Sequence, residues 1–261
     1  MVSGNQSLAN LQRALYASGF QEKVLSLTRN SLVSSGQLKS NCSEIRAARN
    51  GWPLFFFCST KTISPANTNK HKKIMSKKIV IDCGHGKNTA GKFSPIREDG
   101  TRFYEWVSNR QMGKMVFNKL KQNDVDVCFT VDPDDENDMT LKKRVEIANK
   151  IAKEHGIKDT LFISIHSDAF GMADEWYDSA TGYSIFTSEG NTMSDVYAKV
   201  FEETAREMLK THNKKVRGCY QKNFYVLKNT VCPAILLENM FYTSKIDLEF
   251  LDSDEGRDIL T

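Results

Sequence analysis

The sequence lacks long hydrophobic runs and paired cysteines, and each absence excludes a class of protein. No run approaches the ~18 apolar residues of a membrane-spanning helix, so we predict no membrane span. The longest apolar stretch near the start, residues 53–58, is too short and too far inside the chain for a normal signal peptide. The six cysteines form no CxxC pair, which argues against a zinc knuckle or a redox dithiol and favours reduced thiols.

The part of the chain that has the pattern of a folded domain has no excess of positive charge. Residues 1–74 hold 10 Lys and Arg but only 2 Asp and Glu, whereas residues 75–261 hold 26 Lys and Arg and 30 Asp and Glu. The second part is therefore mildly acidic and offers no clustered positive charge for nucleic acid. We expect no nucleic-acid partner.

The pattern of the sequence changes near residue 75. Residues 1–74 are rich in Ser, Asn and Lys without sustained periodicity, which predicts a poorly structured basic leader or a non-native extension from an upstream start codon. Met75 then opens a short basic lead that runs directly into an apolar strand, as a natural protein start would. We expect one folded domain over residues 75–261, with its last helix, at residues 256–261, cut short.

From residue 77 onward, short apolar runs alternate with helical patterns. Apolar runs predict strands at 78–83, 125–129, 161–165, 183–186, 224–227 and 234–237. Periodic segments predict helices at 105–123, 141–152 and 193–209, the second of them capped by Thr140. Strands that alternate with helices favour an α/β sandwich around a largely parallel sheet.

Ionisable residues stand where functional groups collect in such a sheet. His85 leaves the first strand between two glycines, His166 ends the strand at 161–165, and Glu238 ends the strand at 234–237. Glu105 stands at the head of a predicted helix. A hydrogen-bonded His or a solvated Glu would explain any one of them, but the set indicates a site, because burying so many unpaired polar groups is costly.

These residue types fit a metal centre. Two His and one Glu can hold a catalytic zinc, which leaves a fourth position for water and a second Glu to act as base. Magnesium or calcium would prefer oxygen ligands throughout. The sequence has no HExxH helix, so a thermolysin-like arrangement is excluded and the ligands are dispersed along the chain.

The order of the motifs resembles a known family. In chain order, the motifs are DCGHG followed by a Glu, R-x-x-x-A-N from Arg144 to Asn149, SIHSDA, GYSIFTSEGN, Arg217–Gly218 with NFYVL, and LLEN-x-F-x-T-S. This pattern resembles the zinc-dependent N-acetylmuramoyl-L-alanine amidases of the type-3 amidase family. The resemblance covers roughly residues 77–251, and order, spacing and flanking apolar strands all agree.

The resemblance implies a site, a fold and a reaction. His85, Glu105 and His166 would be the ligands of one Zn²⁺ ion, and Glu238 would be the catalytic carboxylate. The fold would be α/β, with a mixed, largely parallel sheet of about six strands flanked by helices on both faces. The reaction would be hydrolysis of the amide between N-acetylmuramic acid and L-alanine of peptidoglycan, by an autolysin or a phage-type lysis enzyme. We expect a monomer that reaches the bacterial cell wall by secretion or by release at lysis.

Substrate contacts are less defined by the pattern. Arg217 and Asn223 lie in the segment that fits the family and are candidate substrate contacts. Lys214, Lys215 and Arg217 would either meet an acidic substrate or form a solvated loop, and the pattern favours the loop. Trp176 stands in a loop longer than the family minimum, where it would stack on a sugar ring or pack locally. The family's Thr-Arg-x-x-Asp turn is missing, because Thr130 is followed by Val131 and an acidic run.

Two other functions are alternatives. One is a non-catalytic peptidoglycan-binding module that retains the amidase fold; Glu238 argues against it, because binding alone needs no base beside a metal. The other is a nucleotide-binding domain, suggested by GHGKNTAGK at residues 84–92. That segment lacks the G-x-x-x-x-G-K-[ST] spacing of a phosphate-binding loop.

Overall fold

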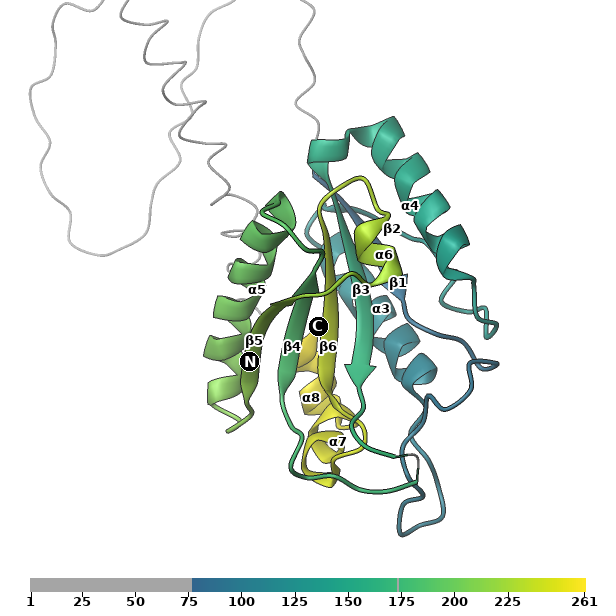
Figure 1. The fold of residues 1–261 in the computed structure, drawn as a ribbon, viewed down its shortest axis with the longest axis vertical. Coiled ribbons are helices and arrows are strands. Elements are labelled where there is room, and N and C mark those ends of the chain that lie inside the picture. The colour runs from purple at the N-terminus through teal and green to yellow at the C-terminus, as the bar shows by residue number, and fades with distance from the viewer. Residues whose placement is uncertain (1–76, 173) are drawn as a thin grey trace, which may run out of the picture. The chain divides into compact units, whose positions relative to one another are not determined.

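A six-stranded sheet forms the centre of the computed structural model, which describes residues 77–261 apart from residue 173. The strands are β1 (Lys78–Cys83), β2 (Asp126–Phe129), β3 (Thr160–Asp168), β4 (Tyr183–Thr187), β5 (Val216–Gln221) and β6 (Ala234–Phe241). Their order is β2-β1-β3-β6-β4-β5 (Figure 1). β2, β1, β3 and β6 are parallel, whereas β4 is antiparallel to β6 and parallel to β5. The predicted mixed, largely parallel sheet is confirmed.

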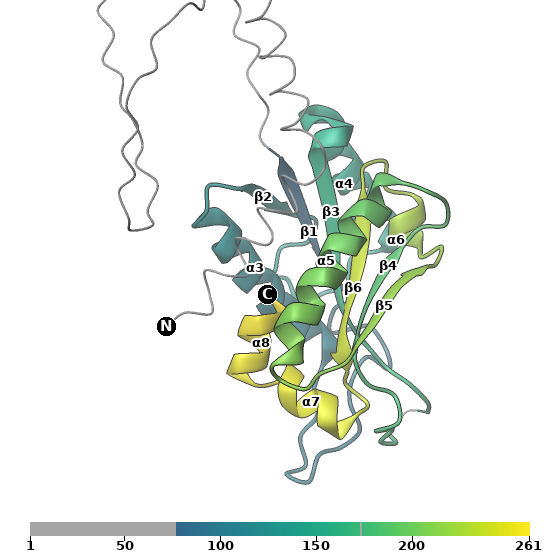
Figure 2. The same cartoon turned by 90° about the vertical axis from the view of Figure 1, so that its left-hand side faces the viewer.

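Helices cover both faces of this sheet (Figures 1 and 2). They are α3 (Glu105–Lys121), α4 (Leu141–His155), η1 (Ile157–Asp159), α5 (Met193–Lys210), α6 (Tyr225–Lys228), α7 (Lys245–Leu251) and α8 (Asp254–Leu260). One hydrophobic core contains side chains of α3, α5, α7 and α8, and the other contains side chains of α4 and α6. The predicted flanking of both sheet faces is therefore also confirmed.

Strand β1 shows why its sequence is almost continuously apolar. Ile79 and Ile81 point into one core, whereas Val80 points into the other, and all three are fully buried. Successive residues of a strand face opposite sides, so a parallel strand covered on both faces needs apolar residues at nearly every position.

Helix α4 begins and packs as its sequence pattern predicts. The Thr140 hydroxyl accepts a hydrogen bond from the backbone N–H of Lys143, which confirms the N-cap. Val145, Ala148 and Ala152 lie on one face of the helix and are buried in the core beside α6. This packing fixes the start of α4 close to the loop that follows β1.

One predicted strand is wrong and one strand was missed. Residues 224–227 do not form a strand, because Tyr225–Lys228 make the single helical turn α6, with Val226 and Leu227 both buried. A short apolar run fits a buried strand or a buried helical turn equally well. The missed strand β5, Val216–Gln221, pairs only with β4 and exposes most of its residues, so its sequence lacks an apolar signal.

The leader or non-native extension expected at residues 1–74 lies outside the residues that the structure describes. Among the described residues, every helix is too short or too polar to cross a membrane.

Candidate active site

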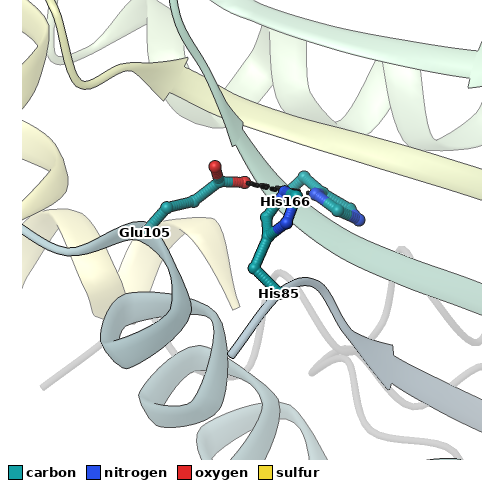
Figure 3. A group of neighbouring side chains, drawn as sticks. All are labelled: His85, Glu105 and His166. Atoms are coloured by element: carbon teal, nitrogen blue, oxygen red, sulfur yellow. Dashed lines mark hydrogen bonds and ion pairs between the residues drawn. The ribbon is translucent and has the colours of Figure 1, made fainter. Parts of the chain in front are cut away.

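Three of the predicted ionisable residues converge where β1 and β3 end (Figure 3). His85 follows β1, Glu105 is the first residue of α3, and His166 lies near the end of β3. Each residue offers one ligand atom, and these atoms all lie within 4.8 Å of one another. The site therefore joins residues that are far apart in the sequence.

Glu105 lies at the centre of the cluster and is fully buried. Its Oε1 atom lies 3.1 Å from Nδ1 of His166 and 3.4 Å from Nε2 of His85. The same oxygen accepts a hydrogen bond from the backbone N–H of Ser167. The buried Oε2 atom has no hydrogen-bond partner among the described residues, although Nζ of Lys92 lies 3.6 Å away.

The environment favours the protonation states that metal ligands need. Burial opposes ionisation of Glu105, but the His166 and His85 imidazoles outweigh it and hold the pKa of Glu105 well below its usual range. Burial also lowers the pKa of His85, which favours its neutral form. One carboxylate with an unpartnered buried oxygen and two imidazoles, one of them held neutral, form a donor set that fits a zinc ion.

The two glycines around His85 provide space for the cluster. A Cβ atom on Gly84 would lie 2.1 Å from Cε1 of His166, and one on Gly86 would lie 2.1 Å from the backbone nitrogen of Asp138. His85 itself adopts the left-handed φ of 62°. The glycines are therefore needed for close packing, and the unusual backbone conformation is taken by the histidine between them.

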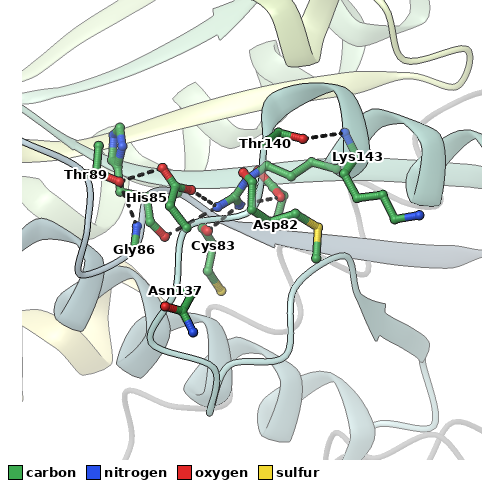
Figure 4. A network of polar contacts seen from close by, with 12 residues as sticks. Asp82, Cys83, His85, Gly86, Thr89, Asn137, Thr140 and Lys143 are labelled. Carbon is green, nitrogen blue, oxygen red and sulfur yellow. Dashed lines mark hydrogen bonds and ion pairs between the residues drawn. The ribbon is translucent and has the colours of Figure 1, made fainter.

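A buried ion pair holds the loop that carries His85 (Figure 4). Arg144 of α4 donates to the Asp82 carboxylate at 2.9 Å and to the Cys83 carbonyl at 2.6 Å. Its other terminal nitrogen donates to Asp138 at 2.8 Å and to the His85 carbonyl at 3.4 Å. The side chains of Arg144 and Asp82 are each only 1% exposed. This network gives the Arg of the R-x-x-x-A-N motif a physical role, which is to fix the backbone on both sides of His85.

Glu238 lies beside the cluster on β6, paired in register with His166 of β3. Its Oε2 atom is buried and has no hydrogen-bond partner among the described residues. Burial, reinforced by the charges of Glu105 and Asp168, raises the pKa of Glu238 well above its usual value. A raised pKa favours the protonated form of a carboxyl group.

The β3–β6 pairing is irregular next to these residues. The register shifts between His166 and Asp168, and Met240 adopts a φ of 64°. The Asn239 side chain donates to the His166 carbonyl at 3.0 Å across this irregularity. Such a bulge changes the direction of neighbouring side chains. Asp168, beyond the irregularity, lines the same cavity as Glu238.

The predicted substrate contacts do not share one cavity. Arg217 and Glu238 both line a cavity of 410 Å³, where Nη1 of Arg217 lies 3.5 Å from the Asp168 carboxylate. Trp176 lines a different hollow, of 590 Å³, and Lys245 lies over its ring. Asn223 is exposed and lines neither hollow. The structure thus places only Arg217 in the same cavity as Glu238.

Sequence reasoning missed Lys92, Asp168 and Lys222. Lys92 reaches the site because the backbone N–H of Glu105 donates a hydrogen bond to the Lys92 carbonyl. No local sequence pattern predicts this contact. Asp168 stands two residues after His166 on one strand, so period-two alternation could have found it. Lys222 follows the missed strand β5 and lines the Glu238 cavity.

The fold is an α/β sandwich, and the residue types of its His–Glu–His cluster are those of a metal centre. Residues 79–261 match the sequence model of the N-acetylmuramoyl-L-alanine amidase family, Amidase_3, and the chain belongs to this family. The family resemblance predicted from the sequence is confirmed.

Individual relatives are distant and several of them are longer. The chain is 28% identical over 178 residues to the N-acetylmuramoyl-L-alanine amidase CwlM of Bacillus licheniformis, covering 67% of this chain and 61% of that protein. It is 26% identical over 183 residues to a 38.4 kDa protein of Clostridium perfringens, covering 70% of this chain but only 48% of that protein. The chain therefore spans about half to two thirds of these relatives.

Solved structures share the fold. An N-acetylmuramoyl-L-alanine amidase from Clostridium difficile 630 superposes with a TM-score of 0.59 at 26% identity, covering 71% of this chain and 91% of that one. The amidase AmiC2 of Nostoc punctiforme gives a TM-score of 0.56 at 27% identity, covering 70% and 90%.

Proposed function

We propose that residues 75–261 are the catalytic domain of a zinc-dependent N-acetylmuramoyl-L-alanine amidase. Its reaction is hydrolysis of the amide that joins N-acetylmuramic acid to the L-alanine of the peptidoglycan stem peptide. The observation that carries the proposal is the convergence of His85, Glu105 and His166 within 4.8 Å, next to Glu238, in a chain of this family.

His85, Glu105 and His166 would hold the metal. Zinc bound by two imidazoles and one carboxylate activates water and polarises a carbonyl group. Glu105 contributes the negative charge of this donor set, and it is fully buried. The Arg144 network keeps His85 in place by bonding to the carbonyl groups of Cys83 and His85.

Glu238 would transfer the proton. Its carboxylate accepts a proton from the attacking water and then delivers that proton to the departing alanine nitrogen. An amide nitrogen is a poor leaving group until it is protonated, so the group must hold the proton between the two steps. The raised pKa of Glu238, caused by burial and by the charges of Glu105 and Asp168, suits this role.

The substrate would be the bacterial cell wall. The relatives include a protein named endolysin from Bacillus phage SPP1, 25% identical over 185 residues. Another is named a probable cell wall amidase, LytH of Staphylococcus aureus, 25% identical over 199 residues. Both names support action on the wall. The chain would act there as a phage-type lysis enzyme or as an autolysin, and the expected monomer stays a prediction.

The test compares wild type with Glu238→Gln on purified peptidoglycan. We expect wild type to release free stem peptides that begin with L-alanine, and a chelator to stop the release. Glu238→Gln should bind the same amount of zinc and release at least about a hundredfold less peptide, since it cannot transfer the proton. Zinc-loaded, folded wild type that binds peptidoglycan and releases nothing would instead support a binding module.

A further inference from the structure

The cavity beside Glu238 has an excess of positive charge that proton transfer does not require. Lys215, Arg217 and Lys222 line it, together with the carboxylates of Asp168 and Glu238. Residues 75–261 as a whole contain more acidic than basic residues, so this cluster of cations opposes the charge of its own domain. A cavity that concentrates one sign of charge attracts a ligand of the other sign.

The protein's own carboxylates neutralise only part of this charge. Arg217 lies 3.5 Å from Asp168, but in the part of the chain that the structure describes neither Lys215 nor Lys222 forms an ion pair. Two of the cations are nevertheless held in place. The Arg217 guanidinium lies over the Phe241 ring at 4.9 Å, and Nζ of Lys222 lies over the Phe224 ring at 4.8 Å. Cations fixed on aromatic faces lose less conformational freedom when they bind an anion.

The charge also distinguishes the two sides of the substrate. In an intact substrate the sugars are N-acetylated and the lactyl carboxyl is part of the scissile amide, so the glycan side has no charge there. The stem peptide carries carboxylates, and the first of them beyond L-alanine belongs to a glutamate residue unless that carboxyl is amidated. Glu238 lines the same cavity and would protonate the departing alanine nitrogen, so the peptide would leave from this cavity.

We infer that the 410 Å³ cavity binds the acidic stem peptide, and that Lys215, Arg217 and Lys222 select stems whose second residue has a free carboxylate over stems in which it is amidated. This inference rests on the proposed function, because it concerns the peptide that follows the scissile bond. The inference also assigns Arg217, one of the predicted substrate contacts, to the carboxylate of the second stem residue.

The experiment compares two synthetic tripeptides, L-Ala-γ-D-Glu-L-Lys and its D-isoglutamine counterpart, which differ only in that carboxylate. Their binding to the zinc-loaded full chain is measured by calorimetry at low and high salt. We expect the acid to bind about tenfold more tightly, because a charge-assisted contact is lost in the amide, and we expect salt to narrow the difference. The double variant Lys215→Gln/Lys222→Gln should lose most of the preference, and both residues are exposed, so folding should be unaffected.

Lys228→Gln is the matched control, because Lys228 is exposed on α6 and does not line the cavity. It should keep the full preference. Equal affinity for the two tripeptides, no binding of either, or a preference that survives the double variant would overturn the inference. Failure of the proposed function would give a different result. The chain would then cleave neither tripeptide when it is attached to N-acetylmuramic acid, whatever its affinities for the two free tripeptides are.

Discussion

Gly84→Ala places the smallest possible side chain against the metal cluster. The added Cβ would lie 2.1 Å from Cε1 of His166 and 2.5 Å from both ring nitrogens. Ordinary contact begins at 3.4 Å, so the imidazole has to move by about 1.3 Å. Metal–ligand distances tolerate deviations of only about 0.2 Å, so we expect Gly84→Ala to lose zinc affinity by at least about a hundredfold.

The cost to the fold should leave the domain folded, because it is small beside the stability of about 5–15 kcal/mol that is typical of a domain. Overpacking of this kind lowers the free energy of unfolding by about 1–3 kcal/mol, and Gly84 does not have a positive φ, so alanine fits its backbone. Zinc affinity is measured by competition with a chelating dye, and stability by urea denaturation. Gly190→Ala is the control: it is strained by a φ of 108° but has no neighbour within 4 Å, so it should lose stability and keep its zinc. Normal zinc affinity in folded Gly84→Ala would refute the reasoning.

Other predictions concern the buried ion pair and the lysine beside the cluster. Arg144→Met should lower the free energy of unfolding by about 3–5 kcal/mol in urea titrations, because it leaves the Asp82 carboxylate buried without its charge partner; unchanged stability would contradict this role. Burial opposes ionisation of Asp82, but Arg144 and two hydroxyl groups outweigh it and lower the pKa of Asp82. Its contribution to stability is therefore complete above its unfolded pKa of 3.8 and lost as the pH falls toward the lower folded pKa; Asp82→Asn should flatten the pH dependence of stability in that range. Lys92→Gln should strengthen zinc binding by about threefold to tenfold, because it removes a cation 3.6 Å from Glu105; weaker binding would show that Lys92 instead holds Glu105 in place.

Much of the site's geometry could be predicted from the sequence, because the carboxyl ends of parallel strands meet at one edge of the sheet. This rule predicted that His85, His166 and Glu238 would lie together, and the structure places His166 and Glu238 in register on adjacent strands. Glu105 joins them because α3 begins where the loop after β1 returns to the sheet. Their roles in binding metal and moving protons stay predictions.

Residues that reach the site through loops or exposed strands could not be predicted in this way. Lys92 depends on a backbone contact with Glu105, and Lys222 follows an edge strand whose sequence has no apolar pattern. The assignment of residues 224–227 to a strand failed because four residues do not show a period. The long loop that carries Trp176 indicates either a sugar contact or local packing, and the structure places Trp176 in a separate hollow.

The central claim is that zinc held by His85, Glu105 and His166 drives cleavage of the muramoyl–alanine amide. The most direct test is to remove the metal from the full chain, titrate zinc back, and count new alanine amino groups released from purified peptidoglycan. The account predicts no release without metal, a linear rise, and a plateau at one zinc per chain, with His166→Ala inactive throughout. The central claim would be contradicted if release did not depend on zinc. It would also be contradicted if new reducing sugar ends appeared in place of new alanine amino groups.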